Sequence, residues 1–247
     1  MGLILAATAP VLFFLFFIYQ KDTVKEPISL LMKCLFGGIV SIAFALVLDA
    51  QIAHFKVFFN TPVLKTFYEA FLTAAIPEEI SKFVVLYYLI WKSKEFDQRF
   101  DGIVYAVFVS LGFALVENIM YVLEGGFKVA TLRAVLSVPG HGFFGVLMGY
   151  YFSNARFNPS SDTTRNILRS LYIPILFHGL YDYIIFYLKN VIDSPLLLLG
   201  LVIFFGILVV MLWRLGLKKI KLLRERDREE LTRMDENPDD TSQEVYP

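Results

Sequence analysis

Long apolar runs separated by short charged segments dominate this chain of 247 residues. Each run is near the length that crosses about 30 Å of hydrocarbon at about 1.5 Å per residue. The runs lie at residues 3–19, 30–49, 76–91, 103–123, 134–153, 168–188 and 195–213. The pattern therefore predicts an all-α, polytopic membrane helix bundle with about seven transmembrane helices.

The segment 62–75 allows two interpretations. It contains Lys65 and Glu69 and is followed by Pro77, which disfavours an uninterrupted helix. We interpret it as an interfacial or re-entrant helix that feeds the third span. If it crosses the membrane instead, the bundle has about eight transmembrane helices.

Basic residues gather in alternate connections between the apolar runs. They are Lys21, Lys25, Lys92, Lys94, Arg99, Arg156 and Arg165, followed by a tail that opens "RLGLKKIKLLRERDR". The other connections are poorer in basic residues, with Lys56, Lys128, Arg133 and Lys189. The first run lacks a basic flank before it, so we expect it to be retained rather than cleaved as a signal peptide. The positive-inside rule then predicts an N-out, C-in, multi-pass protein of the cell membrane.

Composition excludes an ordinary soluble domain, because 57% of the residues are hydrophobic and the mean hydropathy is +0.60. The tail divides into a basic part, 214–228, and an acidic end. We expect the basic part to form a juxtamembrane helix drawn to anionic lipid, and the acidic end to be disordered. No Gly-rich phosphate loop or nucleic-acid module is present, so the predicted environment is the lipid bilayer, with no nucleic-acid partner.

Ionisable and amide side chains inside the apolar runs are the strongest functional signal. A charged side chain at the bilayer centre costs about 2.5 to 3.5 kcal/mol on insertion scales, and such residues usually mark a functional site. The chain places them in four short motifs: Glu78, Glu79 and Lys82 in "PEEISK", Glu117 and Asn118 in "FALVEN", His141 in "HGFFG", and His178 and Asp182 in "HGLYD".

The depths of these motifs agree. Successive spans run in opposite directions, and residue counts from the span ends place all four motifs in the outer half of the membrane. Gly145 follows one helical turn after His141 and would let a neighbouring helix come close. We therefore expect the motifs to converge on one polar cavity.

Helical spacing predicts contacts between residues of one motif that share a helix face. His178 and Asp182 are four residues apart, so Asp182 can hold the imidazole in one orientation. Glu78 and Lys82 have the same spacing, which would neutralise one glutamate and leave the other facing the cavity. Which of Glu78 and Glu79 faces the cavity stays open at this point.

The motifs, taken in order, resemble a known family. Glu78-Glu79-x-x-Lys82, Phe113-x-x-x-Glu117-Asn118, His141-x-x-x-Gly145 and His178-x-x-x-Asp182 are similar to the motifs of the PrsW family of intramembrane proteases. That family is distantly related to the CAAX prenyl endopeptidases and the bacteriocin-immunity proteins. The CAAX branch has an arginine where this chain has Phe83 and a histidine where it has Glu117. The resemblance covers about residues 70–190.

The resemblance implies site-1 cleavage of an anti-sigma factor, a single-pass membrane protein, on its extracytoplasmic side. It supplies the motif core, 70–190, of a transmembrane protease domain that we expect at 1–213, where the last apolar run ends. We expect 214–247 to be a cytoplasmic tail.

Peptide hydrolysis requires a base, a group that stabilises the oxyanion and a proton donor for the leaving amine. No nucleophile-elbow motif is present, and the single cysteine lies near no histidine in sequence. Water activated by a carboxylate is therefore the simplest hypothesis. We expect Glu78 or Glu79 to act as the base, and His141 and His178 to stabilise the oxyanion. The residues expected to orient or support them are Glu117, Asp182, Lys82, Asn118 and Gly145.

No cofactor is required by this hypothesis, and the absence of a His-Glu-x-x-His helix favours a metal-free mechanism. The alternative is a zinc ion held by Glu78, Glu79, His141 and His178, since two imidazoles and one or two carboxylates suit a catalytic zinc.

Two functions of other classes explain part of the pattern. A proton-coupled transporter would also gather glutamate, histidine and aspartate in a membrane cavity. The sequence shows no inverted repeat and no ionisable residues that lead to the other face. A non-catalytic scaffold would explain the close-packing glycine but not the acids.

Overall fold

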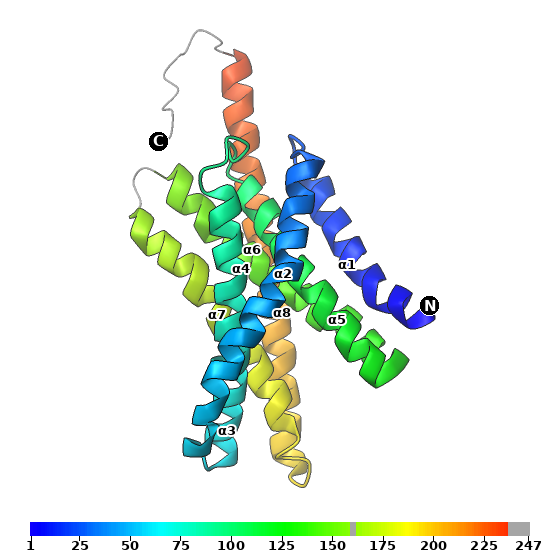
Figure 1. Ribbon diagram of the computed structural model, residues 1–247. Coiled ribbons are helices and arrows are strands. Elements are labelled where there is room, and N and C mark those ends of the chain that lie inside the picture. The colour runs from blue at the N-terminus through cyan, green and yellow to red at the C-terminus, as the bar shows by residue number, and fades with distance from the viewer. Residues whose placement is uncertain (159–161, 237–247) are drawn as a thin grey trace.

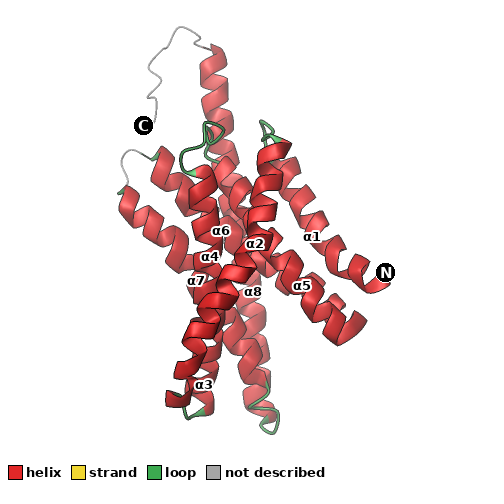
Figure 2. Cartoon of the chain, viewed as in Figure 1, coloured by secondary structure: helices red, strands yellow, loops and turns green. Residues whose placement is uncertain are grey.

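The computed structural model describes residues 1–158 and 162–236, and this part of the chain is helical with short loops and no strand (Figures 1 and 2). The helices are α1 (Gly2–Lys21), α2 (Ile28–Ile52), η1 (Ala53–Phe58), α3 (Pro62–Phe67), η2 (Tyr68–Ala75), α4 (Ile76–Ile90), α5 (Asp101–Val135), α6 (Ser137–Phe157), α7 (Thr163–Leu188) and α8 (Pro195–Glu236). The predicted all-α class is confirmed.

Five helical stretches of the described chain are long and apolar enough to cross a membrane. They are 2–21, 28–58, 101–157, 163–188 and 195–236, and the third contains both α5 and α6. A polytopic membrane bundle is therefore confirmed, while the number of spans stays a prediction. The helix that carries Glu78 and Glu79 is not among the five, in keeping with its several charged residues.

Residues 62–90 form one continuous helix, in which α3, η2 and α4 follow one another. The backbone stays right-handed helical at the junction residues Tyr68 and Ile76. Segment 62–75 thus feeds the next span, as predicted, but without a break. Pro77 has no N–H for the carbonyl four residues earlier, and the wider π-helical turns of η2 come just before it. Glu78 therefore lies near the middle of a long helix rather than at its start.

α5 reverses its direction at Gly126, whose φ of 68° and ψ of −160° interrupt the helix. Only glycine adopts this backbone conformation without strain. The first part of α5, 101–125, is the centre of the fold and packs against α1, α2, α4 and α6. The second part, 127–135, folds back and leads into α6.

The backbones of α5 and α6 are in direct contact. A Cβ atom at Gly149 would lie 2.2 Å from the carbonyl oxygen of Gly102, and one at Gly145 would lie 3.1 Å from that of Ala106. The prediction that Gly145 allows a neighbouring helix to come close is thus supported. This contact brings His141, on α6, beside the part of α5 that carries Glu117.

α8 continues without interruption from the apolar run into the basic segment and ends at Glu236. Its buried side beyond residue 213 includes Ile220 and Leu223. Asp227 accepts hydrogen bonds from the backbone N–H groups of Arg99 (3.0 Å) and Phe100 (2.7 Å), in the connection between α4 and α5. The helix predicted for 214–228 therefore packs on the bundle, and most of the acidic end, 237–247, lies outside the described residues.

The connections of the bundle lie at two opposite ends. The α1–α2 and α4–α5 connections and the C-terminal end of α8 lie at the top of Figure 1, while the η1–α3 turn and the α7–α8 connection lie at the bottom. This is the alternation that the predicted topology requires. It brings basic segments of the first and third connections and the tail to the same end.

Candidate active site

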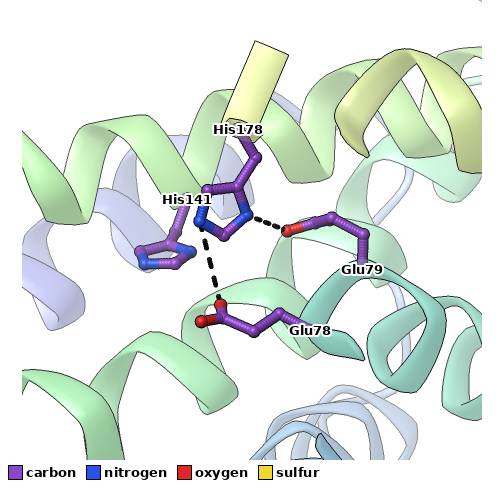
Figure 3. Close-up of side chains that lie close together, drawn as sticks. All are labelled: Glu78, Glu79, His141 and His178. Carbon is purple, nitrogen blue, oxygen red and sulfur yellow. Dashed lines mark hydrogen bonds and ion pairs between the residues drawn. The ribbon is translucent and has the colours of Figure 1, made fainter. Parts of the chain in front are cut away.

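Side chains from α4, α6 and α7 meet in the interior of the bundle. Glu78, Glu79, His141 and His178 each offer one oxygen or nitrogen atom, and these atoms all lie within 4.8 Å of one another. Figure 3 shows the four side chains directed toward a common point. We call these residues the Glu/His cluster. Residues from three motifs that are far apart in the sequence are thus brought together, as the shared depth predicts.

His178 is held between carboxylates. Its Nδ1 lies 2.9 Å from Glu79 Oε1, and its Nε2 lies 3.3 Å from Asp182 Oδ2 and 3.9 Å from Glu78 Oε2. The Phe144 ring stacks on the imidazole with centroids 4.9 Å apart. Since ionised carboxylates only accept hydrogen bonds, both ring nitrogens are placed to donate. The predicted contact between His178 and Asp182 is present.

His141 has a donor on one side and an acceptor on the other. Its Nδ1 lies 3.2 Å from Lys82 Nζ, and its Nε2 lies 2.8 Å from Glu117 Oε2. An ammonium group can only donate and an ionised carboxylate can only accept. Both neighbours therefore favour the tautomer with the proton on Nε2 and an acceptor lone pair on Nδ1, which faces Lys82 on α4.

Lys82 is fully buried, and its ammonium group touches three members of the cluster. Nζ lies 2.8 Å from Glu79 Oε1 and 3.2 Å from Glu78 Oε2, in addition to its contact with His141. The predicted pair with Glu78 is present, and the structure adds the pair with Glu79. Glu79 has 0% of its side chain exposed and Glu78 has 16%. Glu78 is therefore the more exposed of the two glutamates.

Asn118 points away from the Glu/His cluster and fixes α5 to its surroundings. Its Nδ2 donates to the carbonyl oxygen of Ala7 on α1 at 2.6 Å, and its Oδ1 accepts from Arg133 Nε at 2.7 Å. Arg133 also forms an ion pair with Glu117, with Nη2 3.0 Å from Oε2 but without hydrogen-bond alignment. In the sequence, Arg133 lies in a connection between two apolar runs and in none of the four motifs. Two features of the sequence could have identified Arg133. It lies shortly before His141, and Glu117 has no basic residue within one helical turn to pair with.

The Glu/His cluster fits a zinc ion by its donor set. Two imidazoles and two carboxylates are common zinc ligands. Within the described part of the chain, Glu79 Oε2 is buried and has no hydrogen-bond partner, which is what a coordinating oxygen would show. Lys82 contacts three of the four residues, so its ammonium group would need to move aside for such an ion.

An all-helical membrane bundle that gathers buried glutamates and histidines from several helices is compatible with an intramembrane enzyme. The family model described as "PrsW family intramembrane metalloprotease" matches residues 26–212. The chain belongs to this family, and it is a protease of the cell membrane.

Individual relatives agree with this assignment. Protease PrsW of Oceanobacillus iheyensis is 34% identical over 225 residues, which cover 91% of this chain and 97% of that protein. Protease PrsW of Bacillus subtilis is 34% identical over 231 residues, covering 90% of this chain and 96% of that protein. No solved structure gives a significant match. The protease hypothesis is thus preferred over the transporter and the scaffold. The family's description as metalloproteases is compatible with the zinc alternative and does not confirm a metal-free mechanism.

Proposed function

We propose that the chain hydrolyses a peptide bond of a single-pass membrane protein near the extracytoplasmic face, and that this substrate is an anti-sigma factor. The observation that carries the hydrolytic part is the buried Glu/His cluster. The substrate class follows from the family resemblance. The proposed protease domain is 1–213, with the motif core at 70–190.

The depth of His141 and His178 along their helices supports a cut near the extracytoplasmic face. In the predicted orientation, the outer ends of α6 and α7 are Ser137 and Leu188. At about 1.5 Å per residue, His141 lies about 6 Å from the outer end of α6 and His178 about 15 Å from that of α7. In this orientation the two histidines would lie within the hydrocarbon layer, closer to the outer ends of their helices than to the inner ends.

The surroundings of each side chain suggest its role. Glu78 is the partly exposed carboxylate and is the proposed base that takes a proton from the attacking water. His178, with both nitrogens placed to donate and Asp182 behind it, is the proposed donor to the oxyanion and then to the leaving amine. Glu79 holds His178 and Lys82 in place.

The family description favours an alternative mechanism with a metal ion, in which Glu78 and His178 would act as ligands instead. Glu78, Glu79, His141 and His178 would hold the ion, which when bound polarises the scissile carbonyl and acidifies water. Glu117 and Asp182 would fix the rings of His141 and His178 by hydrogen bonds to their other nitrogens.

A metal-free version is the second candidate, and Lys82 favours it. Its ammonium group already places a positive charge beside both glutamates and His141. In this version Lys82 compensates the carboxylates, and His141 and His178 stabilise the oxyanion.

Co-expression with candidate single-pass proteins, in cells that lack the chain's own gene, tests the function. We expect a shortened substrate on gels, and a loss of cleavage of about two to four orders of magnitude for Glu78→Gln. The exposed His54 provides the control His54→Gln, which should cut like the parent. Cleavage at the parental rate by Glu78→Gln, by Glu79→Gln and by the double variant would refute the proposed site.

Chelation separates the two versions. Purified protein should lose activity after exhaustive chelation and regain it with zinc if the ion is required. Elemental analysis should then give about one zinc per chain. Full activity in metal-free protein would select the version based on Lys82.

A further inference from the structure

The second part of α5 brings a cation to the candidate active site from an unexpected place. Arg133 Nε donates to Asn118 Oδ1 at 2.7 Å, although the two residues are 15 positions apart. In a straight helix this separation would be about 22 Å. The reversal at Gly126 closes this distance, and that residue has the only positive φ among the described residues.

Arg133 is held at three points. Besides the hydrogen bond to Asn118, its guanidinium carbon lies 4.4 Å from the centre of the Tyr121 ring, and Nη2 lies 3.0 Å from Glu117 Oε2. Only 14% of the side chain is exposed. Asn118 is itself fixed to α1 through Ala7. The guanidinium group therefore has a defined place beside Glu117.

The oxygen that Arg133 contacts is the one that holds His141. Glu117 Oε2 lies 3.0 Å from Arg133 Nη2 and 2.8 Å from His141 Nε2. A carboxylate paired with a guanidinium group is favoured in its charged, hydrogen-bond-accepting form. That form requires the proton of His141 on Nε2, so that the lone pair of Nδ1 is directed into the Glu/His cluster.

We propose that Arg133 is a positioning residue, which fixes Glu117 and, through it, the tautomer and orientation of His141. This inference rests on the proposed function, in which His141 acts in the cluster. It assigns a role to the segment 127–135 that the motifs do not suggest: the reversal of α5 serves to deliver Arg133. A merely structural clamp would affect stability, but not the state of the imidazole.

A double-mutant cycle tests the path through Glu117. Single-pass substrate from the co-expression screen is reconstituted with the parent, Arg133→Gln, Glu117→Gln and the double variant. We expect Arg133→Gln to lower kcat about 10- to 100-fold with KM little changed. The double variant should match Glu117→Gln alone, because both changes break the same path. Arg133→Lys, which keeps the charge, should recover part of the rate.

The exposed Lys128 lies on the same returning segment and gives the matched control. Lys128→Gln should keep the parental rate and melting temperature. If Arg133→Gln cuts at the parental rate, or if the two losses in the cycle add, the inference is overturned. Should Glu78→Gln and Glu79→Gln also cut normally, the proposed function itself fails, so the two failures are distinguishable.

A spectroscopic test does not depend on activity. The chain has three histidines, so ¹⁵N-histidine NMR of the protein in detergent can be assigned with one variant per histidine. We expect the Nε2–H tautomer for His141 in the parent and a mixture of tautomers in Arg133→Gln. An unchanged His141 signal in folded Arg133→Gln protein would refute the positioning role.

Discussion

Two adjacent glutamates have different surroundings, although one helical step separates them. Glu79 is fully buried between Lys82 and His178, at 2.8 and 2.9 Å, whereas Glu78 is partly exposed. A step of about 100° around the helix axis turns their side chains apart. The pair therefore combines one buried carboxylate that holds Lys82 and His178 with one that is partly exposed.

The different surroundings of Glu78 and Glu79 predict that their substitutions affect cleavage and stability differently. Glu78→Gln should reduce cleavage without much change in melting temperature. Glu79→Gln should reduce both, because it leaves Lys82 and His178 with weaker partners inside the bundle, at a cost of about 1–3 kcal/mol. Melting curves of the purified variants in detergent measure this, and equal melting temperatures would contradict it.

Lys82 should contribute to stability as well as to the site. Lys82→Met removes the only ammonium group that contacts both glutamates among the described residues. Breaking a buried ion pair by removing one partner costs about 3–5 kcal/mol. We expect lower expression and a lower melting temperature, while Lys94→Met, in an exposed loop position, should behave like the parent. A normal melting temperature for Lys82→Met would show that the glutamates need no such partner.

At the scale of elements, the apolar runs predicted the helices well, because spans of hydrocarbon length leave a clear pattern. The continuous helix from 62–75 into α4 was less predictable, because proline usually interrupts a helix. Here the π-helical turns before Pro77 accommodate it without a break. The return of α5 after Gly126 was not predicted either. The sequence of Gly125 and Gly126 does not indicate which of the two glycines adopts a positive φ.

The contact between α5 and α6 should tolerate no side chain at Gly149. A methyl group there would lie 2.2 Å from the carbonyl oxygen of Gly102, so Gly149→Ala should push α6 away. His141, on the same helix, would then move relative to Glu117. We expect a loss of about 1–3 kcal/mol and of cleavage. Gly206→Ala on α8, where no atom lies within 4 Å, is the control, and equal melting temperatures for the two variants would contradict the expected strain.

At the scale of the whole molecule, the sidedness of the bundle decides whether the proposed cut is extracytoplasmic. Reporter fusions after Lys94 should indicate the cytoplasm, and fusions after Gly125 and Asn190 should indicate the outside. The reverse result would place the Glu/His cluster nearer the cytoplasmic face and remove the anti-sigma-factor proposal.

The connection between α1 and α2 should make stability depend on pH. Burial raises the pKa of Asp22 from 3.8 to about 6 and that of Glu26 from 4.5 to about 7. The folded protein therefore keeps protons that the unfolded chain has already released. The contribution of these groups to stability is full below about pH 4 and is lost as pH rises through 6 to 7.

We expect the melting temperature to fall between about pH 4 and pH 7, by about 2–4 °C for each kcal/mol of unfolding free energy that is lost. Glu26→Gln, which stays neutral, should flatten part of this profile. A Glu26→Gln profile that is as steep as that of the parent would contradict the assignment to this connection.

The candidate site was largely predictable because charged residues in apolar runs are conspicuous. Their convergence followed from counting residues along antiparallel helices. The contact between Lys82 and His141 could not be predicted, since it joins residues 59 positions apart through the packing of α4 and α6. Arg133 was not predicted, because basic residues are common in the connections of membrane proteins. Only the reversal at Gly126 brings it to Glu117.

The reach of α8 has a practical consequence for anyone who produces this protein. A shortened gene that ends after Trp213 would keep every apolar run. It would nevertheless delete the buried Leu223, and Asp227, which accepts hydrogen bonds from the backbone of Arg99 and Phe100. We expect such a truncation to give poor yields and aggregation in detergent extracts. A chain that ends after Glu236 would keep these contacts, and is the shorter version to express.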